Sequence, residues 1–294
     1  MTMLRRLAMV LMLSGAAIAA VAGAAAADGG PSPGVSFGGS GVAGPGGKLH
    51  YVAVPTERGT LVESVRVRDG RVMRWNVIRG QLLGIPLVTN DGSAGGLSRD
   101  QRTLILSSYA GSPSGSTATR FAVFDTRRFR VVRRITLRGT YSFDALAPDA
   151  STLYVIQYTS SRDWNRYRVR AYDLVRGRLL AGAVVDKREP AEAMQGSPMT
   201  RVTSADGRWV YTLYARPSGA AFIHALDAAN RAAVCIDLPW QNVAPGALFG
   251  VRMASSGRSI VLSQSPTGRL AVVDSRTFAV RTLRAPVADG TPAG

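Results

Sequence analysis

The chain has 294 residues, with 36 lysines and arginines, 19 aspartates and glutamates, and a formal net charge of +17. This length allows one large domain, and the repeats described below fill it, which leaves no room for a second domain. A single cysteine, Cys235, excludes an internal disulfide framework. The excess of cations favours an acidic partner over a basic one, because a strongly charged protein attracts polyanions.

The first 27 residues have the pattern of a secretory signal peptide. Arg5 and Arg6 precede an uncharged apolar run at 7–22, and a run of alanines ends just before Asp28. An uncleaved membrane anchor is the alternative, because the apolar run is nearly long enough to span a bilayer. The Gly/Pro/Ser-rich linker predicted at 28–44 favours cleavage. We therefore expect a secreted or extracytoplasmic protein, with no membrane span once the signal is removed.

A unit of roughly fifty residues recurs from residue 45 to residue 286. In its clearest copy the turn Asp206-Gly207 precedes an apolar run, and a second run ends at Asp227. The same turn is anchored elsewhere at Gly46, Asp100, Asp149 and Ser256, and the second run also ends at Asp125, Asp173 and Asp274. Asp-Gly pairs accept the positive φ of tight turns, while β-branched and aromatic runs favour strands. These features predict an all-β fold, a β-propeller of about five four-stranded blades.

The first unit is the weakest copy. Its innermost strand would have to come from the Gly-rich stretch 35–43, which has poor strand character. Closure of the ring depends on this strand, and an open array that needs a partner is the alternative. Residues 287–294 are predicted to form a polar tail.

The repeat pattern, polar-Asp-Gly-x-x-apolar-Tyr followed by apolar-x-apolar-x-Asp, resembles the blades of YVTN/YncE-type and WD40-like β-propellers of secreted bacterial proteins. The resemblance covers roughly residues 35–286. The Gly-His and Trp-Asp dipeptides of eukaryotic WD40 repeats are absent. The resemblance implies a binding end built from loops between blades and between the second and third strands of a blade. It implies no single activity.

These loops carry aromatic residues beside arginines, a combination suited to stacking on sugars or to contact with anionic groups. Together with an acid at the predicted channel, the candidate binding residues are Tyr141, Asp144, Arg162, Trp164, Arg166, Arg188 and Trp240. The alternative is that the aromatic residues only pack the loops. Further arginines, Arg130, Arg134 and Arg138, alternate along a predicted outer strand. We expect them on one face, where cations deter edge-to-edge aggregation.

The sequence contains no convincing catalytic, metal or cofactor motif. The two histidines, His50 and His224, both lie in strand patterns, which argues against a catalytic triad. No clustered ligands predict a metal site, and no glycine motif predicts a phosphate or dinucleotide cofactor. Many of the acids fall at repeat turns, but Asp144 does not. The positions equivalent to Asp144 in other units are Gly95, Arg201 and Val251.

The expected function is a secreted, non-enzymatic binding or scaffold protein, monomeric and without a cofactor. Its expected partner is a protein or an anionic cell-envelope ligand such as an acidic polysaccharide. The alternative is a lactonase-like or glycosidase-like propeller enzyme, which would need convergent acids or a metal at the channel mouth, with Asp144 among the residues. Asp144, Asp186 or Glu189 pointing into one pocket would favour it. Nucleic-acid binding is a lesser alternative, because the expected location is extracytoplasmic.

Overall fold

The computed structural model describes residues 34–39, 41–44, 46–109, 118–160, 163–164, 166–188, 195–240, 243 and 245–288. The predicted signal peptide, Arg162 and Glu189 lie outside these residues. The described part of the chain contains 21 strands and one short 3-10 helix, Pro245–Leu248. Within it, no helix has the length and apolar character that crossing a membrane requires.

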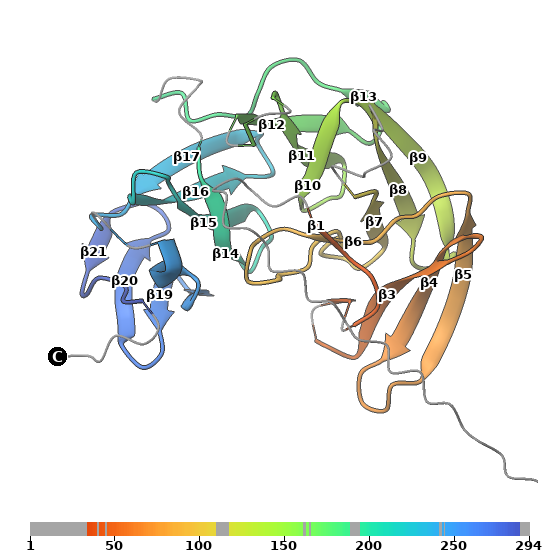
Figure 1. Ribbon diagram of the computed structural model, residues 1–294, viewed down its shortest axis with the longest axis horizontal. Coiled ribbons are helices and arrows are strands. Elements are labelled where there is room, and N and C mark those ends of the chain that lie inside the picture. Colours follow the sequence, from red (N-terminus) through yellow and green to blue (C-terminus); the bar gives the residue numbers. More distant parts are fainter. Residues whose placement is uncertain are drawn as a thin grey trace, which may run out of the picture.

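The strands form six antiparallel sheets (Figure 1). The first sheet contains β2 (Val42–Ala43), β3 (Leu49–Thr56), β4 (Gly59–Arg66) and β5 (Val72–Arg79). The second contains β7 (Thr103–Ser107), β8 (Ala118–Asp125) and β9 (Arg130–Arg138). The third contains β10 (Thr140–Leu146), β11 (Thr152–Tyr158), β12 (Tyr167–Asp173) and β13 (Arg178–Leu179). The fourth contains β14 (Ser197–Thr203), β15 (Trp209–Ala215), β16 (Ala221–Asp227) and β17 (Ala232–Asp237). The fifth contains β18 (Val251–Ser256), β19 (Ser259–Gln264), β20 (Gly268–Asp274) and β21 (Val280–Thr282).

The sixth sheet corrects the predicted count of about five four-stranded blades. It pairs β1 (Gly34–Ser36), which lies inside the predicted linker, with β6 (Ile85–Leu87). The second sheet has only three strands, because its expected innermost strand is reduced to the isolated bridges Leu87–Ala94 and Leu97–Leu104. Two consecutive glycines, Gly95 and Gly96, interrupt this segment, and Gly96 has a φ of 94° that a regular strand does not allow.

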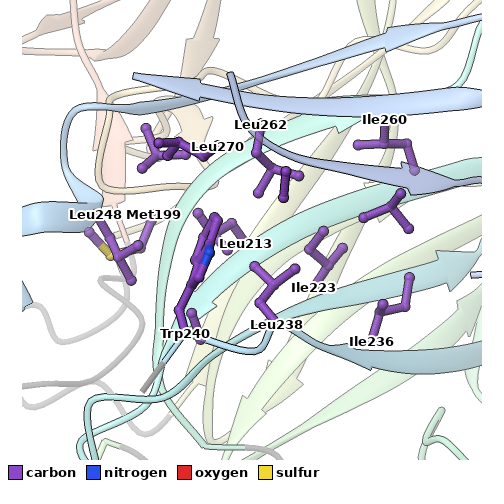
Figure 2. Close-up of a cluster of buried hydrophobic side chains, with 14 of the residues drawn as sticks. Met199, Leu213, Ile223, Ile236, Leu238, Trp240, Leu248, Ile260, Leu262 and Leu270 are labelled. Carbon is purple, nitrogen blue, oxygen red and sulfur yellow. The ribbon is translucent and has the colours of Figure 1, made fainter. Parts of the chain in front are cut away.

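The sheets are stacked in an open arc, and the described residues form no closed ring. The first and fifth sheets lie at opposite ends of the arc, and no strand of one pairs with a strand of the other (Figure 1). The open array that the weak first unit allowed is therefore the arrangement observed. The core is divided accordingly into clusters between neighbouring sheets. In the largest, Leu213 and Ile223 of the fourth sheet lie near Leu262 of the fifth (Figure 2).

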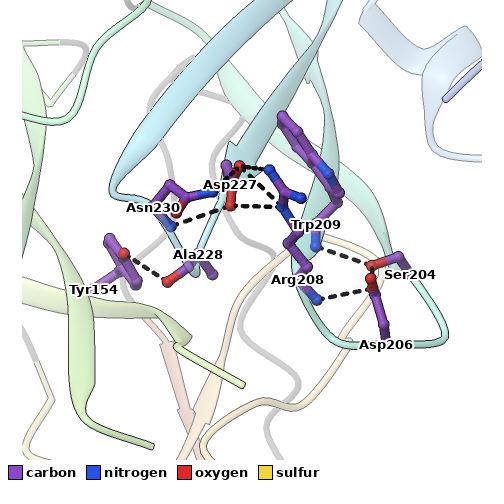
Figure 3. A network of polar contacts seen from close by, with 8 residues as sticks. All are labelled: Tyr154, Ser204, Asp206, Arg208, Trp209, Asp227, Ala228 and Asn230. Carbon is purple, nitrogen blue, oxygen red and sulfur yellow. Dashed lines mark hydrogen bonds and ion pairs between the residues drawn. The ribbon is translucent and has the colours of Figure 1, made fainter. Parts of the chain in front are cut away.

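The predicted Asp-Gly turn forms as expected and links the two halves of its unit (Figure 3). Asp206 accepts hydrogen bonds from the Ser204 hydroxyl at 2.5 Å and the Arg208 N–H at 3.0 Å. The Arg208 guanidinium then reaches Asp227 at 2.7 Å, so that the turn aspartate and the strand-end aspartate are joined through one arginine. Gly207 has a φ of 74°, which explains the glycine after Asp206.

Candidate functional site

A cavity of about 650 Å³ lies at the inner edge of the first four sheets. Its lining includes β2, the Gly95-Gly96 segment, and the ends of β10 and β14. Arg99 extends across its margin, where its Nε donates to the Ala205 carbonyl at 3.2 Å and joins the second sheet to the fourth. The cavity therefore lies toward the turns that follow the innermost strands. The binding loops expected from the sequence lie at the other end of these strands.

A buried ion pair lies at this cavity. Arg201 on β14 binds the Asp144 carboxylate and the Asp144 backbone carbonyl on β10, and its Nε donates to the Thr212 hydroxyl at 2.8 Å. The side chains of Asp144 and Arg201 are only 3% and 10% exposed. Asp144 is the extra residue of a β-bulge, since Phe143 pairs with Val155 and Ala145 with Tyr154. Bulges of this kind redirect a side chain out of the strand alternation.

Three of the four positions that the repeat makes equivalent line this cavity. Gly95, Asp144 and Arg201 are among its lining residues. Val251 is instead fully buried in the core between the fourth and fifth sheets. The repeat could have revealed Arg201 as a partner for Asp144, because both occupy the same position in successive units. Their contact itself depends on how the third and fourth sheets stack.

The carboxylates needed for a glycosidase do not converge among the described residues. Asp144 is engaged by Arg201, and Asp100, the other acid at the cavity, accepts hydrogen bonds from the Ser98 hydroxyl and the Arg102 N–H. Asp186 does not line the cavity. It binds Arg188 at 2.6 Å and accepts the Cys235 N–H at 2.8 Å. The Arg188 guanidinium holds the pKa of the Asp186 carboxyl well below its usual range.

A polar row crosses the fourth sheet beside the ion pair. Arg201, Thr212, His224 and Cys235 are successive cross-strand partners on β14, β15, β16 and β17. His224 is buried, and its Nε2 has no hydrogen-bond partner among the described residues. Burial lowers the pKa of His224 to about 4, so the imidazole is neutral at physiological pH. A buried neutral imidazole is typical of a packed strand residue and agrees with the strand pattern around His224.

The predicted aromatic site residues are largely part of the core. Tyr141 is buried between the second and third sheets, and burial raises the pKa of its hydroxyl. Trp240 is buried between the fourth and fifth sheets, where its Nε1 donates to the Arg284 carbonyl at 3.1 Å. Trp164 is half-buried and packs edge-on against Tyr158, with ring centroids 4.9 Å apart. These contacts favour the alternative in which the aromatic residues pack the loops.

The predicted charged site residues lie on separate elements. Arg166 is exposed in the loop between β11 and β12, whereas Arg188 is held by Asp186 near β17. Asp144 lies at the cavity with Arg201. Arg162 is outside the described residues. The structure therefore does not gather the described members of the predicted set into one surface.

A different set of arginines is gathered on the second sheet. Arg120 on β8 lies opposite Thr136 on β9, and Arg134 and Arg138 flank Thr136 on the same strand. All three arginines are exposed, and none forms an ion pair with a carboxylate in the described part of the chain. We call Arg120, Arg134 and Arg138 the arginine cluster. Sequence reasoning missed Arg120, because its place beside the other two depends on the register of β8 and β9.

Arg130 departs from the single face expected for the arginines of β9. A bulge pairs Val123 with Arg133 but Phe124 with Val131. Val131 thereby packs with Phe124 on the core between the first and second sheets. Because the bulge breaks the alternation at this point, Arg130 does not continue the row formed by Arg134 and Arg138.

Among the described residues, no group of three or more His, Cys, Asp or Glu side chains is placed to hold a metal ion. No protein-family profile matches the chain, and no curated protein matches it.

Solved structures with similar folds include a β-propeller domain and two larger proteins. The Cps50 (Swd1) β-propeller domain of Myceliophteria thermophila is 13% identical with a TM-score of 0.48, and the match covers 90% of this chain and 73% of that chain. Hydrazine synthase of Kuenenia stuttgartiensis is 13% identical with a TM-score of 0.47, covering 82% and 64%. TolB of Acinetobacter baumannii is 15% identical with a TM-score of 0.39, covering 70% and 44%. The chain thus spans less than two thirds of the last two proteins, and a shared activity does not follow at this similarity.

Proposed function

We propose that this protein acts outside the cytoplasm as a non-enzymatic binding module for an anionic polymer of the cell envelope, such as an acidic polysaccharide. The observation that supports this function is the arginine cluster, three exposed guanidinium groups without carboxylate partners in the described part of the chain. We also propose that its repeats are of the YVTN/YncE type, because their turn and strand-end aspartates keep that pattern.

The two strands of the cluster space its charges for a repeating ligand. Arg120 is diagonal to Arg134 and Arg138, and diagonal neighbours in an antiparallel pair lie about 7–8 Å apart. The residues opposite Arg134 and Arg138 are the small alanines Ala122 and Ala118, and the Arg134 guanidinium donates one hydrogen bond to the neutral Gln81 side chain. Guanidinium groups bind carboxylate and phosphate through paired hydrogen bonds, so successive anionic groups of one polymer suit this surface.

Many of the chain's acids are unable to neutralise this surface, because they stabilise turns. Asp100, Asp149 and Asp206 each accept the backbone N–H of the residue two positions later. The remaining positive field raises the encounter rate with polyanions and is screened by salt. Binding should therefore weaken as salt concentration rises.

Fluorescence anisotropy with labelled polygalacturonate tests the function, with neutral dextran as the control polymer. Arg120→Gln/Arg134→Gln/Arg138→Gln should weaken binding about tenfold at low salt. The matched variant Arg58→Gln/Arg71→Gln/Arg276→Gln removes the same charge from exposed arginines on three other segments. It should change the affinity by less than about threefold.

The outcomes separate a localised site from a diffuse field. Equal losses in the two triple variants would show that no localised site exists on the second sheet. A larger loss in Trp164→Ala/Arg166→Ala would move the site to the loop between β11 and β12, which carries these two of the candidate residues predicted from the sequence. If polygalacturonate fails to bind the unmodified protein even at low salt, the proposed function is wrong.

A further inference from the structure

The first sheet is apolar on both of its faces. One face packs against the second sheet through residues such as Val62 and Ile78. We call the opposite face the leading face. Its cross-strand rows are Val54, Leu61 and Val77, then Val52, Glu63 and Trp75, and then His50, Val65 and Val72. These rows thus hold seven apolar side chains, with Glu63 as their one carboxylate.

No other part of the described chain covers the leading face fully. Trp75 is 67% exposed and Val72 is 41% exposed, whereas Val52 in the middle row is buried, and none of the seven apolar residues belongs to a core cluster of the described residues. An antiparallel sheet that faces water normally alternates apolar inward and polar outward residues. The composition of the leading face is therefore that of a buried face, and contiguous exposed apolar surface of this kind marks an interaction site.

The fifth sheet also has one uncovered face, which we call the trailing face. One cross-strand row on it contains Ala254, Val261, Val272 and Arg281, and the next contains Arg252, Ser263 and Arg269. The opposite side of this sheet carries Ile260 and Leu262, which pack on the fourth sheet. A third row contains Ser256, Ser259 and Asp274, whose carboxylate is paired with Arg258. The trailing face therefore has small side chains at its centre, three arginines around them and one acid that is already paired.

The two faces are complementary in size and in charge. The leading face carries the large side chains Trp75 and Leu61, and the trailing face carries the small residues Ala254 and Ser263. Glu63, the one acid of the leading face, would meet a face whose arginines include Arg269 and Arg281, neither of which forms an ion pair in the described part of the chain. Opposite potentials of this kind favour correct pairing over pairing of like faces.

The order of stacking also identifies these faces as partners. Along the arc each sheet packs one face on the preceding sheet and the other on the following sheet. The leading face is the side that would meet a preceding sheet, and the trailing face is the side that would meet a following one. The two faces lie at opposite ends of the arc, so the chain as folded does not bring them together (Figure 1).

We propose that the trailing face of one copy packs against the leading face of a second copy, which continues the sheet stacking from chain to chain. This head-to-tail contact replaces the monomer expected from the sequence. Because it joins two different surfaces, it leaves a free face at each end of a dimer. It therefore builds a closed ring or a growing chain of copies, depending on whether the rotation closes.

Sedimentation velocity over a range of concentrations tests the contact. The unmodified protein should show a weight-average mass that rises with concentration. Trp75→Arg on the leading face and Ala254→Arg on the trailing face should each reduce the mass to that of a monomer. Val175→Arg introduces the same charge at a residue that is 73% exposed and outside both faces, and it should leave association unchanged. Circular dichroism and thermal melting verify that each variant is folded.

Mixing the two blocked variants gives the decisive result. The Trp75→Arg copy keeps a normal trailing face, and the Ala254→Arg copy keeps a normal leading face. Their mixture should form a one-to-one dimer that cannot grow further, although each is monomeric alone. A monomeric unmodified protein at all concentrations would overturn the proposal. A Glu63→Cys/Ser263→Cys disulfide that forms only within one chain would overturn it too, because the two faces would then meet in the same molecule.

Discussion

Arg201 on β14 binds Asp144 on β10 across the boundary between the third and fourth sheets, at the wall of the inner cavity. The two residues are 57 positions apart and occupy equivalent places in successive repeat units. A buried charge is stable only when it is paired and hydrogen-bonded, and here the Thr212 hydroxyl accepts from Nε, the third nitrogen of the Arg201 guanidinium. The pair therefore holds two sheets together. It also occupies the Asp144 carboxylate, which the sequence placed at the predicted channel.

Breaking this pair should destabilise the protein strongly. Arg201→Met leaves the Asp144 carboxylate buried without its cation, at a cost of about 3–5 kcal/mol in the free energy of unfolding. Asp144→Leu/Arg201→Met should cost less than the sum of the two single changes, because it leaves no uncompensated charge. Urea denaturation measures both. A loss below about 1 kcal/mol in Arg201→Met would contradict the buried pair.

His224 should make stability depend on pH in a defined window. Its pKa is about 4 in the folded chain and about 6.5 when unfolded. Between these values the unfolded chain binds a proton that the folded chain does not, so the contribution is complete above pH 6.5 and is lost as pH falls toward 4. The total loss is about 3 kcal/mol.

The control for this pH dependence is the other histidine. Denaturant titrations at several pH values should show a shallower slope between pH 4 and 6.5 for His224→Gln than for His50→Gln. The comparison uses slopes, so a constant change in stability caused by either substitution does not affect it. Equal slopes in the two variants would show that His224 is not the group that titrates.

Two turn glycines should differ in how much they tolerate a side chain. Gly207 and Gly257 have φ angles of 74° and 57°, so alanine at either position is strained. At Gly207 an added Cβ would also lie 2.9 Å from Cδ of Arg99, whereas at Gly257 it would meet nothing within 4 Å. We expect Gly207→Ala to cost about 1–3 kcal/mol and Gly257→Ala about 1 kcal/mol, measured by thermal denaturation. The reverse order would contradict the contact between Arg99 and the turn.

Two tryptophans should separate core packing from surface association. Trp240 is 2% exposed in the core between the fourth and fifth sheets, so Trp240→Ala should cost about 3–5 kcal/mol of stability. Trp75→Ala should leave the stability of dilute protein within about 0.5 kcal/mol, because its indole is exposed on the leading face. Chemical denaturation at low protein concentration measures both. A large loss in Trp75→Ala would show that the indole is packed within its own chain.

The local structure of the repeats was predictable because it depends on neighbouring residues. The aspartate of each turn caps the N–H groups that follow it, and glycine supplies the positive φ, so the turns at Asp206 and Asp227 form where the sequence indicates. The second sheet was harder to predict, because the glycines at 95 and 96 replace an inner strand by isolated bridges. The sequence also did not predict the bulges at Asp144 and in β9, since they depend on how one strand pairs with another.

The candidate binding residues were likewise predictable only where they depend on neighbouring residues in the sequence. Aromatic residues beside arginines indicated binding loops, yet Tyr141 and Trp240 are buried because the stacking of neighbouring sheets places them in the core. The arginine cluster required the register of β8 and β9, which brings Arg120 next to residues about fifteen positions away.

The sequence by itself determined the all-β class, the repeat length and the turn chemistry, because these follow from strand propensity and from hydrogen bonds between residues a few positions apart. The tertiary structure alone decided that the sheets form an open arc, that Asp144 is paired with Arg201, and that Trp75 is left on an uncovered face. These features depend on the angle at which successive sheets pack. Side-chain contacts between the sheets determine that angle, and no local pattern in the chain encodes them.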